Sequence, residues 1–232
     1  MSTEIKSNSR VSAVVLAAGS SSRMGEAKQL LPLADSTVLE QTLRNLNAAD
    51  VDGVVLVLGS SAETIRQRIA DSPTKNLRIL VNPEYGRGMA TSLRAGLAAL
   101  DKNIDAALIV LADQPFIRPE TFNQIVDQYR RSEAQIVIPM FQGFRGNPVL
   151  LDRSVFHEVM ALQGDMGCRA IFGNHLDGIL KAEVDDVGVL LDIDSKDDYE
   201  RLRDFGPAQQ ASMLAEVTRQ IRRRGNRVDA AD

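Results

Sequence analysis

Short apolar runs alternate with helix-like periodic segments from Val11 to about Asp204 of this 232-residue chain. This alternation is typical of βαβ units, in which crossover helices join parallel strands. It predicts an α/β fold with a mostly parallel sheet and helices on both faces. The expected strands are Val11–Ala18, Gly53–Leu58, Leu77–Val81, Ala106–Ala112, Gln135–Pro139, Pro148–Leu151 and Ile179–Val184.

The segments between these strands carry helix signals. Ser36 is expected to be the N-cap of the first helix, because a short polar side chain there can accept a backbone hydrogen bond. Ser195 with Asp198 has the spacing of a capping box for a short helix through Arg203. The other expected helices are Ala62–Ala70, Gly88–Leu100, Pro119–Arg131, Arg153–Leu162 and a short helix entered from the loop at Gly164–Gly173.

The chain length fits one large α/β domain. We expect residues 11–205 to form it, residues 1–10 to be a flexible N-terminus, and residues 206–232 to be a C-terminal helix followed by a basic tail. Met213, Leu214, Val217 and Ile221 share one face of that helix. The basic tail is expected to be solvated, with docking onto a partner subunit as the alternative.

Charge and composition restrict the partners. A formal net charge of −4 provides no overall basic field, so we expect no nucleic-acid partner. The longest apolar run, Ala106–Ala112, is far too short to span a membrane, and Met1–Arg10 lacks the apolar core of a signal peptide. A single cysteine, Cys168, fits a reducing cytoplasm, and with His157 and His175 it is expected to have a structural role.

The loop Leu16–Lys28 follows the first strand and has the composition of a phosphate loop. Its small residues allow close approach of the backbone, while Arg23 and Lys28 supply positive charge. It is not a Walker A loop, because five residues separate Gly19 from Gly25 and no Gly-Lys-Ser/Thr follows. It is not a dinucleotide-binding glycine motif either, because serines stand where glycines are needed. A solvated turn with two surface cations is the alternative.

Two acidic motifs follow later in the chain. Asp113 comes directly after the buried strand Ala106–Ala112, where a carboxylate beside a phosphate loop is suited to hold Mg²⁺. Asp192 and Asp194 lie on the same side if their segment is extended, so one of them can meet the same metal. The alternatives are a carboxylate that opens a turn before Pro115 and surface carboxylates that cap a helix.

Six motifs follow one another along the chain, namely Leu16–Lys28, Gly88-Met89-x-x-Ser92-Leu93, Asp113-Gln114-Pro115, Gly146-Asn147-Pro148, Gly164-Asp165-x-Gly167-x-Arg169 and Asp192-Ile193-Asp194. In this order they resemble the motifs of the molybdenum cofactor cytidylyltransferases, within the wider MobA-like nucleotidyltransferases. The resemblance covers Val11 to about Leu202 and implies the Rossmann-like nucleotidyltransferase fold. Ser195-Lys196-Asp197 departs mildly from the usual sequence after the last motif.

The resemblance implies site roles, motif by motif. Arg23 and Lys28 would contact the triphosphate and, with Asp113, form the catalytic set. Asp113 and Asp194 would hold Mg²⁺. The nucleotide would be bound by Leu16, Ala17, Ala18, Gly19, Arg23, Lys28, Gly88 and Ser92, and the acceptor by Asn147, Asp165 and Arg169.

The implied reaction transfers CMP from CTP to the terminal phosphate of molybdopterin or molybdenum cofactor, with release of pyrophosphate. The implied partners are these two substrates and an acceptor molybdoenzyme. Ala17-Ala18 resembles cytidine users, where guanylyl-transferring relatives have two glycines. The alternatives are a cytidylyltransferase acting on a sugar or polyol phosphate, a non-catalytic cofactor carrier and, least favoured, a Rossmann oxidoreductase.

Overall fold

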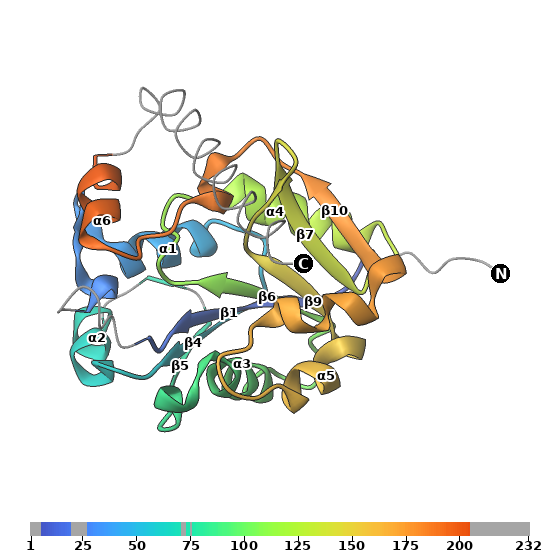
Figure 1. The fold of residues 1–232 in the computed structure, drawn as a ribbon, viewed down its shortest axis with the longest axis horizontal. Helices are drawn as coiled ribbons and strands as arrows, with labels where there is room; N and C mark the ends of the chain where they lie inside the picture. Colours follow the sequence, from blue (N-terminus) through green and yellow to red (C-terminus); the bar gives the residue numbers. More distant parts are fainter. Residues whose placement is uncertain (1–5, 20–26, 71–72, 75, 205–232) are drawn as a thin grey trace, which may run out of the picture.

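A computed structural model describes residues 6–19, 27–70, 73–74 and 76–204. Its main sheet has the strand order β10-β7-β9-β6-β1-β4-β5 (Figure 1), and β8 pairs with β7. The strands are β1 Val11–Ala17, β4 Val54–Leu58, β5 Leu77–Val81, β6 Ala106–Leu111, β7 Ile136–Phe141, β8 Phe144–Arg145, β9 Val149–Asp152 and β10 Ile179–Glu183. A separate hairpin pairs β2 Pro32–Leu33 with β3 Ser36–Thr37.

The main sheet is mostly parallel, which confirms the predicted fold class. β1 pairs in parallel with β4 and β6, β4 with β5, and β7 with β10. Two strands are reversed: β9 runs antiparallel to both β6 and β7, and the short β8 runs antiparallel to β7. The carboxyl ends of β1, β4, β5 and β6 therefore meet at one edge of the sheet, which we call the carboxyl edge, and the opposite edge is the amino edge.

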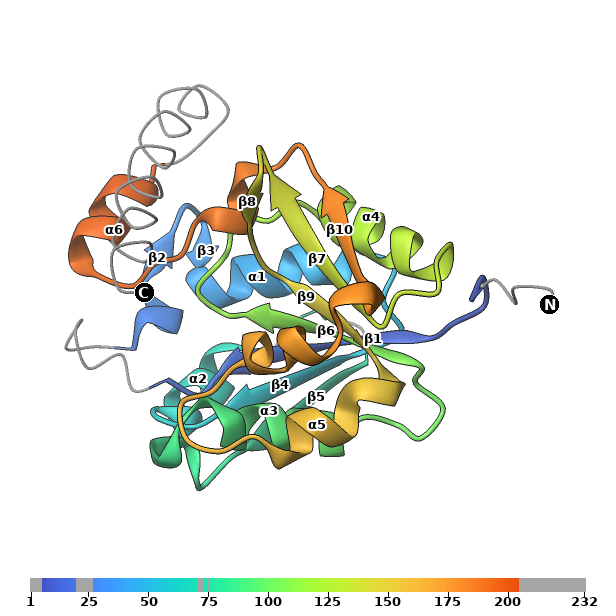
Figure 2. The same ribbon diagram turned by 45° about the vertical axis from the view of Figure 1, so that its right-hand side comes forward.

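Helices cover both faces of this sheet. Figure 2 shows α1 and α4 on one face and α3 and α5 on the other. The α-helices are α1 Val38–Asn47, α2 Ala62–Arg68, α3 Met89–Ala98, α4 Pro119–Arg130, α5 Phe156–Ala161 and α6 Lys196–Leu202. The 3-10 helices are η1 Lys28–Leu30, η2 Tyr85–Arg87, η3 Arg153–Val155, η4 Cys168–Asn174, η5 Leu176–Gly178 and η6 Val187–Leu190.

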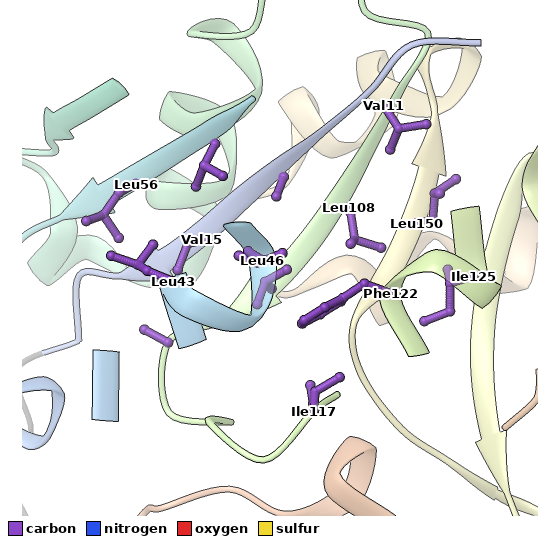
Figure 3. Close-up of a cluster of buried hydrophobic side chains, with 14 of the residues drawn as sticks. Val11, Val15, Leu43, Leu46, Leu56, Leu108, Ile117, Phe122, Ile125 and Leu150 are labelled. Carbon is purple, nitrogen blue, oxygen red and sulfur yellow. The ribbon is translucent and has the colours of Figure 1, made fainter. Parts of the chain in front are cut away.

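The central strands β1, β4, β6 and β7 are apolar on both sides because helices cover both faces of the sheet there. Along β1, Val11 and Val15 pack beneath α1 and α4 with Leu43 and Phe122 (Figure 3), whereas Val14 packs on the α3 side. All five side chains are almost completely buried. The unalternating apolar runs in the sequence therefore correspond to strands with a core on each side.

Two helix starts test the capping predictions. The N-cap of α1 is Thr37 and not Ser36: Thr37 accepts from the amide of Glu40, whose carboxylate accepts in return from the Thr37 amide. Ser36 instead donates to the carbonyl of Leu33 within the hairpin. The capping box of Ser195 and Asp198 at α6 is confirmed.

The described part of the N-terminal segment contacts the domain. Lys6 donates to the carboxylate of Asp152 at 2.8 Å, and Arg10 bonds to Asp52 at 3.0 Å. No helix in the described ranges is long and apolar enough to cross a membrane. The predicted C-terminal helix and tail, residues 206–232, lie outside the described residues, and so does Arg23.

Candidate active site

A cavity of about 700 Å³ lies at the carboxyl edge of the sheet. Its walls come from the ends of β1 and β6, from η1, from the segment that leads into α3, and from two acidic loops. Ligands of open α/β sheets collect at this edge because the strand ends and the loops that follow them meet there. The lining residues are Leu16, Ala18, Gly19, Lys28, Gln29, Tyr85, Gly86, Arg87, Gly88, Met89, Ser92, Leu111, Ala112, Asp113, Asp165, Asp192 and Asp194.

Most of the expected site residues that the structure describes are brought together here. Residues from five separate motifs line this cavity, namely Leu16, Ala18, Gly19, Lys28, Gly88, Ser92, Asp113, Asp165 and Asp194. Asn147 and Arg169 line a second, adjoining cavity instead. Gln29 and the Tyr85–Arg87 turn are additional lining residues that were not expected; each lies next to a motif, and that adjacency was the available signal. Met89, which also lines the cavity, belongs to the expected Gly88–Leu93 motif.

Ala17, the last residue of β1, and Ala18, the next residue, face opposite ways. Ala18 lines the cavity, whereas Ala17 is buried in the core beneath α1 and does not line it. The Ala17 carbonyl accepts a hydrogen bond from the buried side-chain amide of Gln29, at 3.2 Å. Gly59 packs so closely on this segment that a Cβ there would lie 2.6 Å from the Ala18 carbonyl oxygen. The chain around Ala18 is thus fixed by its neighbours.

A lysine and two carboxylates form the charged centre of the cavity. The Lys28 ammonium donates to Asp113 at 2.5 Å and to Asp194 at 2.9 Å. The amide of Ile193 donates to the backbone carbonyl of Asp113 at 3.0 Å, which ties the two acidic segments together. Burial lowers the pKa of Lys28, but Asp113 and Asp194 outweigh it and the net pKa is raised, so Lys28 is charged.

Asp192 lies beside these carboxylates and also lines the cavity. Burial raises its pKa to about 6, and the negative charges of Asp194 and Asp113 raise it further. The contribution of these two carboxylates indicates that negative charge at this position is not fully neutralised by Lys28. The centre therefore has capacity for an additional cation.

The donor set fits a divalent cation such as Mg²⁺. Asp113 Oδ1 is buried and has no hydrogen-bond partner within the described residues, and its other oxygen shares one ammonium with Asp194. The described ranges hold no group of three or more His, Cys, Asp or Glu side chains placed to hold a metal. Mg²⁺ often needs only one or two carboxylates, because substrate phosphates and water complete its coordination.

The start of α3 forms the opposite wall of the cavity. Asp165 Oδ1 accepts from the amide of Met89 at 3.2 Å, and the carbonyl of Gly164 accepts from the amide of Ala90 at 3.1 Å. Gly88 has φ +107°, and any Cβ there would collide with the Gly164 backbone. The Gly164–Asp165 turn therefore caps α3, a contact across more than 70 residues that no local pattern indicates.

Ser92 is held inside this wall. Its hydroxyl accepts from the side-chain amide of Asn82 at 3.0 Å, and the same amide donates to Thr91 at 2.8 Å. Both serine and asparagine are almost completely buried. This network fixes the first turn of α3 against the end of β5, so Ser92 contributes position as well as a polar surface.

The second cavity, of about 160 Å³, shares Leu16, Met89 and Leu111 with the first. Asn147 and Arg169 line it, together with Arg145, which the sequence did not single out. Arg145 lies 24 positions before Arg169 in the chain, so only the folded structure brings these two side chains to one rim.

Cys168, His157 and His175 have the structural roles expected for them. Burial raises the pKa of the Cys168 thiol to about 12, which keeps it protonated at neutral pH. His157 Nδ1 lies 2.8 Å from the Ser154 carbonyl, and His175 Nε2 lies 2.5 Å from Glu158. The histidine contacts lie on the α5 side, and neither histidine lines the two cavities.

The described geometry can be compared with known proteins. Residues 13–179 match the model of the MobA-like NTP transferase domain. The molybdenum cofactor cytidylyltransferase of Escherichia coli K12 is 25% identical over 193 residues, which cover 82% of this chain and 94% of that protein. The nicotine blue oxidoreductase of Paenarthrobacter nicotinovorans is 30% identical over 168 residues, covering 68% of this chain and 79% of that protein.

Solved structures show the same fold. The crystal structure of Rv0371c from Mycobacterium tuberculosis H37Rv matches with a TM-score of 0.75 at 32% identity, covering 85% of this chain and 99% of that one. Its complex with manganese matches with a TM-score of 0.70 at 30% identity, covering 85% and 100%. The carboxyl-edge cavity thus lies in a fold that this chain shares with nearly the whole Rv0371c chain.

Proposed function

The chain belongs to the MobA-like NTP transferase family, and from that premise we propose that it transfers CMP from CTP to the terminal phosphate of molybdopterin or molybdenum cofactor. One observation carries the proposal: Lys28 joins Asp113 and Asp194 at the edge of a cavity of about 700 Å³. That volume is within the usual range of small-molecule sites, roughly 300 to 1,000 Å³. The similarity to the Escherichia coli cytidylyltransferase supports this choice of reaction.

The reaction forms a bond between an oxygen of the acceptor phosphate and the α-phosphorus of CTP. The bond from that phosphorus to the bridging oxygen breaks, and pyrophosphate leaves. The acceptor phosphate is already anionic at neutral pH, so no general base is needed. The main tasks of the protein are positioning and charge neutralisation, and this agrees with a cavity that no histidine of the described chain lines.

Each task has candidate residues in this chain. Lys28 and Arg23 would bind the triphosphate oxygens, and Asp113 and Asp194 would hold the divalent cation. When bound, Mg²⁺ would neutralise charge on the phosphate oxygens. The manganese complex of the Rv0371c relative supports a divalent cation in this fold. The partly exposed Asp194 leaves its own side of the site open to substrate.

The nucleotide and the acceptor would occupy different parts of the site. Leu16, Ala18, Gly19, Gly88 and Ser92 would border the nucleotide, and Ala17 would contribute backbone only, because its methyl group is in the core. Asn147 and Arg169 would lie on the acceptor side, in the second cavity. Asp165 lines the larger cavity and would serve the acceptor side through its hold on α3 rather than as a free carboxylate.

The choice of CTP rests on Ala18. A methyl group beside the base restricts a purine more than a pyrimidine, and Ala18 supplies that methyl at the cavity wall. We also propose that the enzyme is cytoplasmic and that Cys168 is reduced. A molybdoenzyme that takes up the cytidylylated cofactor is the partner that this reaction implies.

The test is pyrophosphate release from a panel of nucleoside triphosphates, with and without purified molybdenum cofactor. Release that needs both CTP and the cofactor is expected. Turnover with a plain sugar or polyol phosphate would mean that this compound, and not molybdenum cofactor, is the acceptor. Binding of the cofactor without turnover would indicate a carrier. A parallel assay of NADPH oxidation would detect an oxidoreductase, the activity named for the Paenarthrobacter nicotinovorans relative.

A further inference from the structure

The second cavity, which we call the annex, has an apolar wall and a cationic rim. Its volume of about 160 Å³ equals roughly five water molecules at liquid density. Water in such a space would lack polar partners along most of the wall, so the annex is better suited to a ring. The apolar lining comes from Leu16, Leu93, Ile109, Leu111, Val149 and Phe172.

The rim carries two arginines. The Arg145 guanidinium lies over the ring of Phe172, 5.4 Å from its centre, and Arg169 is close enough to act on its charge. Burial lowers the pKa of Arg145, and the positive charge of Arg169 lowers it further. Neither arginine forms an ion pair with a carboxylate in the part of the chain that the structure describes. Two like charges held together in this way favour an anion between them.

The annex is continuous with the larger cavity, because Leu16, Met89 and Leu111 line both. We infer that the annex binds the ring end of the acceptor, a flat heteroaromatic group with negative charge beside it, and that Arg145 determines acceptor specificity. This inference rests on the proposed function, in which Asn147 and Arg169 lie on the acceptor side and the acceptor phosphate reaches the α-phosphorus of CTP in the larger cavity. The ring would stack against the guanidinium of Arg145.

The same lining argues against a sugar or polyol acceptor at this position. Hydroxyl groups placed against Leu93, Ile109 and Val149 would lose their hydrogen bonds to water without replacement, which is costly. A fused ring instead buries its faces against such a wall. The annex therefore distinguishes between the acceptor classes that the sequence left open.

The test uses two fluorescent probes, pterin-6-carboxylate and uncharged pterin, titrated into the full chain without nucleotide. Arg145→Met should weaken binding of the carboxylate about 10- to 100-fold, because a charge-assisted bond is lost. Uncharged pterin should lose less, and Arg145→Lys should recover part of the loss. Phe172→Leu should weaken both probes. Lys181→Met is the matched control, because Lys181 is an exposed cation of β10 that lines neither cavity.

Equal binding of pterin-6-carboxylate to Arg145→Met and Lys181→Met would overturn the inference, and so would no binding to the wild-type chain. Thermal melts would show that Arg145→Met remains folded. In the pyrophosphate assay, Arg145→Met should raise KM for the cofactor and leave KM for CTP unchanged. If Arg145→Met showed cofactor-dependent turnover with an unchanged KM for the cofactor, the annex would not bind the acceptor, although the proposed function would stand. If pterin bound in a charge-dependent way but the wild-type chain showed no turnover, the annex inference would stand and the proposed function would not.

Discussion

Two lysine–aspartate pairs lie at opposite edges of the same sheet and differ in how fully their charges are satisfied. Lys6 bonds to Asp152 at 2.8 Å at the amino edge, and Lys28 bonds to Asp113 at 2.5 Å at the carboxyl edge. Their side chains are similarly buried, with exposed fractions of 21% and 17% for the first pair and 16% and 15% for the second. Burial therefore does not explain why they differ.

At the amino edge, both oxygens of Asp152 have partners. One accepts from Lys6 and from the Tyr129 hydroxyl at 2.7 Å, and the other accepts from the amide of Ser154 at 2.8 Å. Burial alone would raise the pKa of Asp152, but the hydrogen bonds from Lys6, Ser154 and Tyr129 outweigh it and the pKa is lowered. This cluster stabilises the folded chain.

At the carboxyl edge, one ammonium serves several carboxylates. Lys28 is shared by Asp113 and Asp194, Asp113 Oδ1 has no partner in the described residues, and the pKa of Asp192 rises. A buried polar group left without a partner costs free energy, and such groups concentrate at functional sites. The amino-edge cluster thus contributes stability, whereas the carboxyl-edge cluster leaves negative charge unsatisfied, as the proposed cation site requires.

The largest expected effect comes from Asp113→Asn. Turnover should fall about 100-fold or more, because an amide keeps the shape but removes the charge that would hold the cation. The thermal midpoint should stay close to wild type or rise, since negative charge is removed from a crowded site. Pyrophosphate release at saturating Mg²⁺ and a thermal melt are the measurements. Wild-type turnover would refute the metal role of Asp113.

Asp152→Asn should have the opposite profile. We expect a loss of about 1 to 3 kcal/mol in unfolding free energy, because Lys6 loses a charged partner while remaining largely buried. Turnover of the folded fraction should be unchanged. Urea titration beside the pyrophosphate assay measures both quantities. Wild-type stability of this variant would show that the amino-edge cluster does not stabilise the folded chain.

Acid should reduce the difference between wild type and Asp152→Asn. Because the folded-state pKa of Asp152 is lowered, its contribution is fully present above the ordinary value of 3.8 and is lost as pH falls below that value. Protonated Asp152 then resembles asparagine. Urea titrations at neutral pH and at several values below 3.8 should show the two stabilities converge; a constant gap would mean that the charge of Asp152 contributes nothing.

Lys28→Met and Lys6→Met compare the two ammonium groups. Lys28→Met should raise KM for CTP about tenfold with a smaller change in kcat, because Lys28 would contact phosphates in both ground and transition states. It should also tighten binding of Mn²⁺ without nucleotide, measured by paramagnetic resonance, because the ammonium no longer competes for Asp113 and Asp194. Lys6→Met should lower stability and leave KM unchanged. Unaltered KM and Mn²⁺ affinity in Lys28→Met would make Lys28 a surface cation.

Much of this architecture is predictable from local pattern. The apolar runs gave the strands of the main sheet except β8, because strands covered on both faces need continuous apolar sequence. The reversal of β9 was not predictable, since periodicity carries no information about strand direction. The first N-cap was misplaced by one residue, although Glu40 three positions after Thr37 completes a capping box that the sequence already contained.

The site was predictable where one loop or one strand end carries several of its groups. Lys28 and Asp113 were expected together because each follows a strand whose carboxyl end lies at the same edge. Asp194 was expected to join them because the resemblance implies that it shares a metal with Asp113. The capping of α3 by Asp165 and the meeting of Arg145 with Arg169 were not, because each depends on packing between distant segments. The opposite orientations of Ala17 and Ala18 depend on where β1 ends, because successive side chains of a strand point to opposite faces and Ala17 is the last residue of the strand.

Substitutions of these two alanines have the smallest expected effects. They again compare a residue that contributes to stability, Ala17, with one that contributes to the site, Ala18, but neither carries a charge. Ala18→Gly removes a methyl group from the cavity wall, so the CTP preference over GTP should fall, by less than the roughly 1 to 3 kcal/mol that one methylene discriminates. Ala17→Gly removes a methyl group from the core inside β1 and should cost about 1 to 2 kcal/mol of stability without changing nucleotide preference. Values of kcat/KM for both nucleotides and a urea titration of each variant decide the matter. If Ala17→Gly changed the preference and Ala18→Gly did not, the base would lie against the other face of this segment, and selectivity would depend on the shape of the loop rather than on the methyl group at its wall.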